Sequence, residues 1–341
     1  MKNNSFKKIL SAAISAALCV SALAACGTKN ETSKTDGAGG ADGKVYKIGV
    51  TQIADHPSLD NCREGFIEGL KNAGFVEGKN VEIEFQSAKN DTANAGQIAQ
   101  NFASLGKDLV CGISTPSAQA LYTACYEKGI PVIFNAISDP VAAKLAKSET
   151  EAMDGITGIS DALPVEAQLK LIRSILPDAK KIGIIYTTSE ANSVSTIETY
   201  KKLAPKYNFE IVERGIGNQS EVAQAADVVL KDADCISNLT DNTVVAALSV
   251  VLEKANAAGK PVFGSEEEQV GNGCLASAGL DYFKLGEQAG AMAARVLNGE
   301  KVSNIPYETM KESSITINPK VAEALGITIP EDVSKDAQIK E

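Results

Sequence analysis

The sequence predicts an α/β protein whose folded part contains two doubly wound parallel sheets. Apolar runs of strand length alternate with amphipathic segments of helix length from about residue 45 to residue 160, and the same alternation begins again near residue 180. Buried strands that alternate with helices are typical of parallel sheets covered on both faces. The repeated pattern therefore predicts two similar α/β halves, one after the other in the chain.

Five strands are expected in each half, because each run is short, apolar and bounded by turn-forming residues. In the first half the strands are expected at residues 46–53, 80–88, 108–114, 131–137 and 155–160, with helices near 59–73, 91–105 and 117–128. In the second half the strands are expected at residues 180–188, 209–216, 234–240, 261–265 and 274–281, with helices near 192–205, 220–231 and 242–258.

The N-terminal segment has the pattern of a secretory signal peptide over residues 1–25. Lys2, Lys7 and Lys8 precede an apolar run without charge at residues 9–23, which ends in small residues. This run is shorter than the ~20 residues that span a bilayer as a helix. We therefore expect the mature chain to be exported.

The end of that segment, "LAAC" at residues 23–26, resembles the lipobox of bacterial lipoproteins. The resemblance implies that Cys26 carries diacylglycerol and acyl chains such as palmitate; the alternative is an ordinary cleavage site with Cys26 incidental. Two or more acyl chains give stable anchoring where one does not. Residues 26–44 contain no large apolar side chain and predict a flexible tether between that anchor, on the extracytoplasmic face of the cell membrane, and the folded part.

Charge argues against a nucleic-acid partner. The formal net charge is −10, and it becomes −13 without residues 1–25, which hold three lysines and no acid. An acidic chain without a basic patch repels a phosphate backbone.

The cysteines and the single histidine restrict the chemistry further. Five cysteines follow Cys26, and an odd number without close pairing cannot complete a disulfide framework. Buried thiols are expected, with a Cys111–Cys125 bond as the alternative. His56 is the only histidine, which excludes a Cys/His zinc cluster, and no cofactor or metal is expected.

Polar residues follow several of the expected strands, at the sheet edge where doubly wound proteins bind ligands. After the third strand, Ser114 and Thr115 precede Pro116, which favours a helix start. The free backbone amides at the start of a helix form a binding site for an anion or carboxylate. The alternative is that the Ser114 or Thr115 hydroxyl only caps the helix.

The equivalent loops carry more polar groups than helix capping alone requires. They are Ser138 and Asp139 in the first half, and Glu190, Asn192, Ser193, Thr240, Asp241 and Asn242 in the second. If the two edges face each other, a ligand lies in the cleft between the halves; if they do not, each half has a separate site.

Several longer blocks resemble the ABC transporter substrate-binding lipoproteins, and are most similar to the branch that includes tryptophan and tyrosine binders. They extend over nearly the whole folded part, from about residue 48 to 330. They are "GVTQIADHPSLDNCREGFIEGLKNAGFVEGKNV", "TPSAQALY", "PVIFNAISDPVAAKL", "TGISDALPVEAQLKLIRSILPDAKKIGIIYTTSEANS", "TDNTVVAAL" and "ASAGLDYFKLGEQAGAMAARVLNGE".

The resemblance implies a type I periplasmic-binding fold, in which two lobes joined by three crossovers close on a solute. The crossovers are expected near 158–162, near 276–280 and after residue 306. Lobe 1 then comprises residues 45–160 and 278–306, lobe 2 comprises residues 161–277 and 307–330, and a polar tail covers 331–341.

The resemblance also implies a function. The chain is expected to be the monomeric, extracytoplasmic solute-binding component of an ABC importer, with the permease and its ATPase as partners and an amino acid, aromatic in preference, as solute. A membrane-tethered sensor and a binder of another solute are the alternatives. An enzyme is not expected, because no nucleophile, phosphate-loop or zinc-protease motif is present.

Within that fold, a zwitterionic amino acid would place its carboxylate at Ser114 and Thr115. Its ammonium group would need a carboxylate from the other lobe, with Asp241 as the first choice and Glu190 as the second. The alternative for Asp241 is to cap the helix that begins at Thr243, and both roles can hold together. Asn192, Ser193 and Asn242 would supply hydrogen bonds, and the expected ligand-binding set is completed by Gln52, His56, Ala118, Ser138, Asp139, Thr240 and Asp281.

Overall fold

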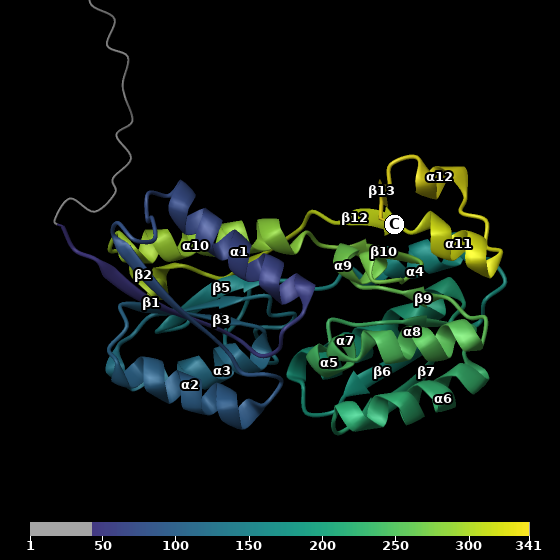
Figure 1. The fold of residues 1–341 in the computed structure, drawn as a ribbon, viewed down its shortest axis with the longest axis horizontal. Helices are drawn as coiled ribbons and strands as arrows, with labels where there is room; N and C mark the ends of the chain where they lie inside the picture. Colours follow the sequence, from purple (N-terminus) through teal and green to yellow (C-terminus); the bar gives the residue numbers. More distant parts are fainter. Residues whose placement is uncertain (1–42, 341) are drawn as a thin grey trace, which may run out of the picture. The chain divides into compact units, whose positions relative to one another are not determined.

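The computed structural model describes residues 43–340 and contains two α/β lobes, each built on one sheet (Figure 1). The expected signal peptide, the lipid-modified Cys26 and most of the tether lie outside the described residues. The residues of the first and second expected halves form separate sheets, so the prediction of two parallel-dominated α/β units is confirmed.

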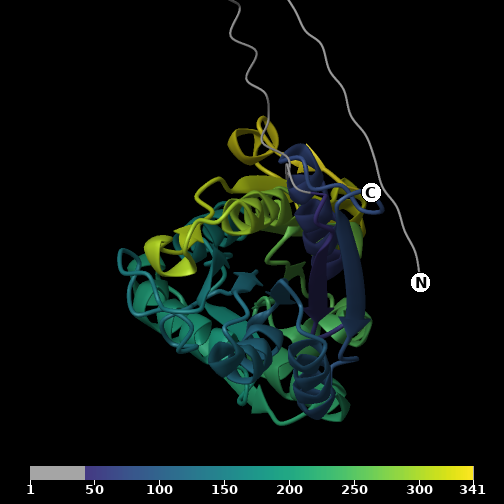
Figure 2. The same cartoon turned by 90° about the vertical axis from the view of Figure 1, so that its left-hand side faces the viewer.

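The first lobe has a six-stranded, wholly parallel sheet in the order β11-β5-β4-β3-β1-β2. Its strands are β1 (Tyr46–Gln52), β2 (Val81–Ser87), β3 (Leu109–Ile113), β4 (Val132–Asn135), β5 (Ile156–Ser160) and β11 (Glu308–Thr309), and its helices are α1 (Pro57–Asn72), α2 (Thr92–Ser104), α3 (Thr115–Cys125), α10 (Tyr282–Leu297) and the short η1 (Tyr126–Lys128) and η4 (Val302–Asn304). Helices α1 and α10 cover one face of the sheet, and α2 and α3 cover the other. Figure 2 views this lobe from its outer side, with β1 and β2 in purple and dark blue.

The second lobe has a seven-stranded sheet in the order β13-β12-β10-β9-β8-β6-β7, parallel except where β10 meets β12. Its strands are β6 (Lys181–Thr187), β7 (Glu210–Ile216), β8 (Cys235–Ser237), β9 (Val262–Phe263), β10 (Ala276–Gly279), β12 (Ser314–Ile317) and β13 (Gln338–Ile339). Its helices are α4 (Val165–Ile175), α5 (Ala191–Leu203), α6 (Val222–Asp232), α7 (Asn242–Ala246), α8 (Leu248–Ala257), α9 (Glu267–Gly271), α11 (Pro319–Leu325), α12 (Glu331–Ser334) and the short η2 (Ala204–Tyr207) and η3 (Gln219–Glu221).

Each of the ten expected strands contains an observed strand, but several helices differ from expectation. Helix α4 was not among the expected helices, although it buries a continuous apolar face. The single helix expected at 242–258 is broken at Ala247, because the Ala247 amide donates to the carbonyl of Val244, three residues back instead of four.

The chain crosses between the lobes after β5, after β10 and after β11. Two boundaries differ from those expected. Residues 308–309 extend the first sheet beside β5, so the last crossover follows Thr309 rather than Pro306. The expected polar tail carries α12 and β13, and β13 adds an edge strand beside β12. Strands β11 and β13 are only two residues long and lie at sheet edges. They are too short to show an apolar strand pattern in the sequence.

Helices α1 and α10 pack unusually closely. A methyl group at Gly65, Gly69, Gly286 or Gly290 would lie within 2.3 Å of a backbone oxygen of the facing helix. Glycine at all four positions lets the two backbones touch, which fixes the N-terminal end of α1 relative to α10. The N-terminal ends of both helices lie at the interface between the lobes.

The five cysteines of the folded part are buried and unbonded, which confirms the prediction of buried thiols over a Cys111–Cys125 disulfide. Burial raises the pKa of Cys62, Cys111, Cys235 and Cys274, so these thiols remain protonated at neutral pH.

Candidate functional site

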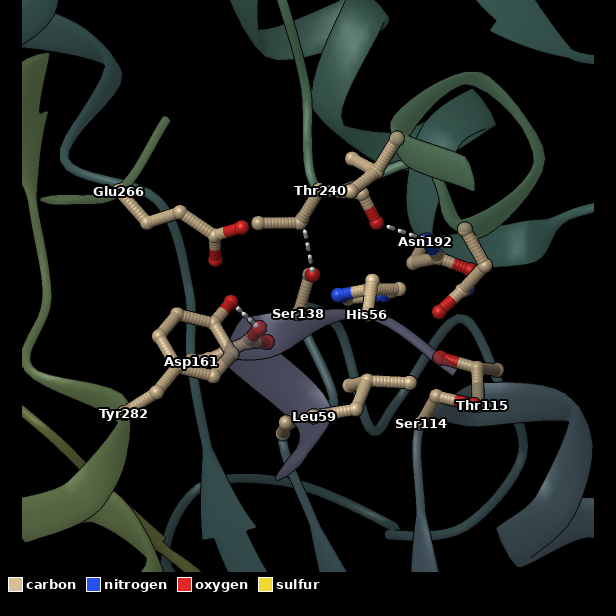
Figure 3. Close-up of a pocket in the computed structure, with 13 residues that line it drawn as sticks. His56, Leu59, Ser114, Thr115, Ser138, Asp161, Asn192, Thr240, Glu266 and Tyr282 are labelled. Atoms are coloured by element: carbon tan, nitrogen blue, oxygen red, sulfur yellow. Dashed lines mark hydrogen bonds between the residues drawn. The ribbon is translucent and has the colours of Figure 1, made fainter. Parts of the chain in front are cut away.

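A small cavity lies between the two lobes, where the carboxyl ends of their strands face each other (Figure 3). The first lobe contributes His56, Leu59, Ser114, Thr115, Ala136, Ser138 and Tyr282, the first crossover contributes Asp161, and the second lobe contributes Asn192, Thr240, Asn242, Val245 and Glu266.

One side of the cavity is formed by the turn that joins β3 to α3. Ser114 is the whole of this turn, and its φ of 78° is a strained value for a residue other than glycine. Its hydroxyl is buried, has no hydrogen-bond partner, and does not cap α3. The capping alternative is therefore wrong for Ser114, and the hydroxyl and the first-turn amides of α3 are available to an anionic group.

The other side of the cavity is acidic. Asp161 follows the last residue of β5, and Glu266 follows β9 after two residues; their side chains are 2% and 1% exposed. The hydroxyl of Tyr282, the first residue of α10, donates to Asp161 Oδ2, while Asp161 Oδ1 is buried without a partner. Figure 3 shows these three side chains together, across the cavity from Ser114 and Thr115.

No basic side chain offsets these acids at the cavity wall, since none of the described residues that line it is lysine or arginine. Burial raises the pKa of Asp161. Burial, followed by the nearby Glu268 carboxylate, raises the pKa of Glu266 to about 8. A buried carboxylate without a cation is costly, so the site is electrostatically suited to a cationic group.

His56 lies at the start of α1 and both of its ring nitrogens are buried without a partner. Burial lowers the pKa of His56 to about 4, so the ring is neutral at physiological pH. A neutral imidazole presents one donor and one acceptor. The side chain can therefore contribute hydrogen bonds to a ligand but no charge.

Asparagine and hydroxyl groups of the second lobe complete the wall. Asn192 Nδ2 donates to the carbonyl oxygen of Thr240 at 3.1 Å, which leaves Asn192 Oδ1 buried without a partner. The hydroxyl groups of Thr240 and Ser138 lie 3.2 Å apart and connect the two lobes.

Asp241, the first choice for an ammonium partner, does not line the cavity. Its carboxylate accepts four hydrogen bonds within the second lobe, from the amide and hydroxyl of Thr187 at 2.6 and 2.8 Å, the hydroxyl of Ser193 at 2.7 Å and the amide of Val244 at 2.9 Å. Asp241 caps α7 and ties it to β6 and α5, so the helix-capping role weighed against its ligand role is the one observed.

Glu190, the second choice, is also committed to its own lobe. It accepts hydrogen bonds from the amide and side chain of Asn242 at 3.1 and 2.6 Å, and from the amide and hydroxyl of Thr243 at 3.2 and 3.0 Å. Burial and the Asp241 charge raise the pKa of Glu190 to about 7. Glu190 orients Asn242, which does reach the cavity.

The remaining expected residues divide between the cavity and its surroundings. Those that line it are His56, Ser114, Thr115, Ser138, Asn192, Thr240 and Asn242. The other five expected residues lie outside the cavity wall. In the first lobe, the Gln52 side chain donates to the Ala54 carbonyl and to Asp60, Ala118 lies in α3 against β3, and Asp281 caps α10 through the Lys284 amide. Asp139 accepts a hydrogen bond from the Ser195 hydroxyl, and the Ser193 hydroxyl donates to Asp241.

Sequence reasoning missed six residues of the cavity wall, namely Leu59, Ala136, Asp161, Val245, Glu266 and Tyr282. Asp161 and Glu266 were within reach of the rule that polar residues after strands face the ligand, because both follow expected strands. Tyr282 also follows an expected strand, whereas Leu59, Ala136 and Val245 are apolar and carry no such signal.

Two classes of feature are absent from residues 43–340. No group of three or more histidine, cysteine or acidic side chains there is arranged to hold a metal ion. No helix in this range combines the length and apolar character that crossing a membrane requires.

The family model for ABC transporter substrate binding proteins matches residues 47–340. The chain belongs to this family. It is thus the extracytoplasmic substrate-binding component of an ABC transporter, which captures a small solute and works with a permease, and it is not an enzyme.

Relatives support the same assignment. A protein named a tyrosine-binding protein, from Clostridioides difficile strain R20291, is 42% identical over 325 residues, which is 94% of this chain and 92% of the relative. A conserved domain protein from Vibrio cholerae has a solved structure that is 40% identical and superposes with a TM-score of 0.85 over 87% of this chain and 100% of that one.

Two solved substrate-binding structures differ in how well they match. The complex of a Streptococcus pneumoniae domain with L-Trp is 35% identical and gives a TM-score of 0.84 over 87% of this chain and all of that one. A ligand-free, open structure of a substrate binding protein from Clostridium difficile is 39% identical but gives 0.67 over 87% of this chain and 99% of that one. The more similar sequence gives the poorer superposition, as a different arrangement of two lobes would.

Proposed function

We propose that this substrate-binding protein captures a zwitterionic amino acid, with an aromatic side chain in preference, between its two lobes. Asp161 and Glu266 hold the ammonium group, and the N-terminal end of α3 with the Ser114 hydroxyl holds the carboxylate. The observation that carries the proposal is the pair of buried carboxylates on a cavity wall whose described residues include no lysine or arginine.

The unpartnered polar atoms support the choice of a zwitterion. Asp161 Oδ1 and Asn192 Oδ1 can accept hydrogen bonds from an ammonium group, whereas the Ser114 hydroxyl can donate one to a carboxylate. Burying a polar atom without a hydrogen-bond partner costs about 1–3 kcal/mol of free energy, and a ligand group that pairs with the atom recovers this cost. A solute that lacks either charged group would leave one side of the cavity unpaired.

The preference for an aromatic side chain rests on the relatives and on the wall. One relative is named for tyrosine and another was solved with L-Trp. In this chain Leu59, Val245, Tyr282 and the neutral His56 ring supply apolar surface beside the polar groups. The higher TM-score with the L-Trp complex supports a closed arrangement of the two lobes here.

The placement of the protein in the cell follows from the N-terminal segment. Residues 1–25 are removed as a signal peptide, Cys26 carries the lipid anchor, and residues 27–44 tether a monomeric body above the membrane. A short tether keeps the closed lobes close to the permease and its ATPase, which raises their effective concentration there.

The test is a thermal-shift measurement on the purified full chain with all amino acids, tyramine, 3-(4-hydroxyphenyl)propionate, sugars and polyols. A solute at 100 times its Kd adds about 2.7 kcal/mol to the stability of a protein with one site. We expect tyrosine, tryptophan or phenylalanine to raise the Tm. The matched analogues of tyrosine that lack the carboxylate (tyramine) or the ammonium group (hydroxyphenylpropionate) should have little effect.

Two results would contradict the proposal in different ways. A shift by hydroxyphenylpropionate as large as that by tyrosine would remove the role of the acidic wall. A shift by a sugar or polyol alone would leave the family assignment in place but replace the amino acid.

A further inference from the structure

We propose that Asp161, Glu266 and Glu268 form a charge gate, which opposes closure of the lobes until the solute's ammonium group, or a proton, neutralises it. This inference rests on the proposed function for the identity of the cation. The inference goes beyond the proposed function because it assigns a role in closure to residues that also join the lobes.

The gate lies where the start of α9 in the second lobe meets the start of α1 in the first. The Ser58 hydroxyl donates to Glu266 Oε1, and Asn61 Nδ2 donates to Glu268 Oε1 at 2.6 Å. Ser58 and Asn61 are three residues apart in α1, so they present adjacent donors on one side of the helix. These bonds connect the two lobes and require the closed arrangement.

The same contacts bring acidic groups together. Glu266 is buried against Ser58 with Glu268 beside it, and Asp161 lies on the same wall of the cavity. Gln269 Nε2 also donates to Glu266 Oε1 at 3.0 Å, so the closed lobes satisfy this oxygen with neutral donors only.

Six titratable groups around Glu266 are neutral or acidic. These groups are Asp161 in the first crossover, Glu268 in α9, Tyr282 in α10, Cys62 in α1, Cys274 before β10, and His56 across the cavity. Lys340 lowers the pKa of Glu268, but its ion pair, at 3.5 Å, is with Glu267.

The electrostatic consequence is a penalty on closure. Like charges brought together in a desolvated interface repel, and each carboxylate also loses its hydration. Burial raises the pKa of Asp161 and Glu268 and raises that of Glu266 to about 8. In the open form, where water reaches these groups, their pKa values return toward the ordinary range of about 4.

The sign of the pH dependence follows from this difference. A carboxyl group with a raised pKa in the closed form binds a proton there that it lacks in the open form. The penalty on closure without solute is therefore smallest below about pH 4. It grows as the pH rises and is largest above about pH 8. An ammonium group beside Glu266 lowers its pKa again, so closure on the solute near neutral pH does not require these carboxyl groups to take up a proton.

The first experiment compares hydrogen–deuterium exchange of the full chain with that of its Glu266→Gln variant at about pH 8 without solute. The glutamine keeps an oxygen for Ser58 but removes the charge. We expect amides of residues 57–61 and 266–269 to exchange several-fold more slowly in the variant, because its closed form is more populated. The matched control is Glu253→Gln, an exposed side chain of α8 that does not line the cavity and lies outside both segments, and it should exchange as the wild type does.

The second experiment repeats the exchange measurement on solute-free wild type at about pH 5 and about pH 8, after correction for the intrinsic exchange rate at each pH. We expect amides of residues 57–61 and 266–269 to be more protected at the lower pH, and this difference to be smaller in Glu266→Gln and in Asp161→Asn. If Glu266→Gln does not fold, the Asp161→Asn variant gives the same comparison in both experiments.

The outcomes separate the gate from the proposed function. Unchanged exchange in folded Glu266→Gln and Asp161→Asn, or protection in the wild type that does not depend on pH, would overturn the gate while the amino-acid site stands. If no amino acid binds the wild type, the proposed function fails, and slower exchange in the variants would still support the gate.

Discussion

At the scale of single residues, Asp161 and Asp241 show what a buried carboxylate can do in the same kind of loop. Both follow a strand and both are almost fully buried. Asp241 accepts four hydrogen bonds from its own lobe, whereas Asp161 has one oxygen without any partner. The first carboxylate therefore organises the lobe, and the second is available to a solute.

Replacing Asp241 by alanine should lower the stability of the protein rather than act on binding alone. The change leaves the Thr187 amide, the Ser193 hydroxyl and the start of α7 without their acceptor, and we expect the free energy of unfolding to fall by about 3 kcal/mol. Urea denaturation measures it. The control Asp281→Ala removes a more exposed helix cap and should cost about 1 kcal/mol.

The opposite result would restore the role first expected for Asp241. Unchanged stability together with loss of amino-acid binding would identify its carboxylate as a solute contact.

At the scale of elements, the crossing of α1 and α10 positions much of the site. His56 directly precedes helix α1, which carries Ser58 and Leu59, and α10 begins with Tyr282. The four glycines at the crossing place the two backbones in contact, so the ends of both helices are held at the cavity. The spacing of these glycines was visible in the sequence, but the partner of each helix was not.

The substitution Gly69→Ala should separate these helices. Its methyl group would lie 2.2 Å from the Glu287 carbonyl oxygen, and overpacking of this kind costs about 1–3 kcal/mol. We expect that loss in urea denaturation. The control is Gly96→Ala in α2, where no atom lies within 4 Å of the added methyl group. Alanine there should stabilise the helix by up to about 1 kcal/mol.

A stability of Gly69→Ala equal to that of the wild type would mean that the helices can move apart without cost. In that case the crossing would not hold the start of α1 in place.

At the scale of the whole molecule, the two lobes are connected by three crossovers, and the site exists only between them. Seven of its thirteen wall residues come from the first lobe, and Asp161 comes from the first crossover itself. A hinge in this position couples solute contacts in both lobes to their relative orientation. The proposed anchor would keep this two-lobed body at the membrane that holds its permease.

The proposed anchor predicts that Cys26→Ala changes the location of the protein and not its solute binding. Without the thiol no diacylglycerol can be attached, and the folded part alone has no described helix that could span the bilayer. Membrane fractionation and detergent partition should move the variant from the membrane to the aqueous fraction. A variant that stays with the membrane while wild-type mass shows no lipid would contradict the anchor.

Much of the architecture could be predicted from the sequence, because strand and helix periodicity are local properties. The ten core strands, the two halves and the family resemblance were all visible in contiguous residues. The two-residue edge strands β11 and β13 were not, since their pairing depends on neighbours that are distant in the chain.

The site was predictable only in part for a physical reason. The sequence determined that polar groups gather at the carboxyl ends of both sheets, and that serine and threonine precede α3. Only the tertiary structure decided which carboxylates are satisfied, because hydrogen bonds such as those from Thr187 to Asp241 join residues far apart in the chain. It also brought Asp161 and Glu266 to one wall without a compensating lysine or arginine, and this pairing of distant charges is what gives the cavity its proposed choice of solute.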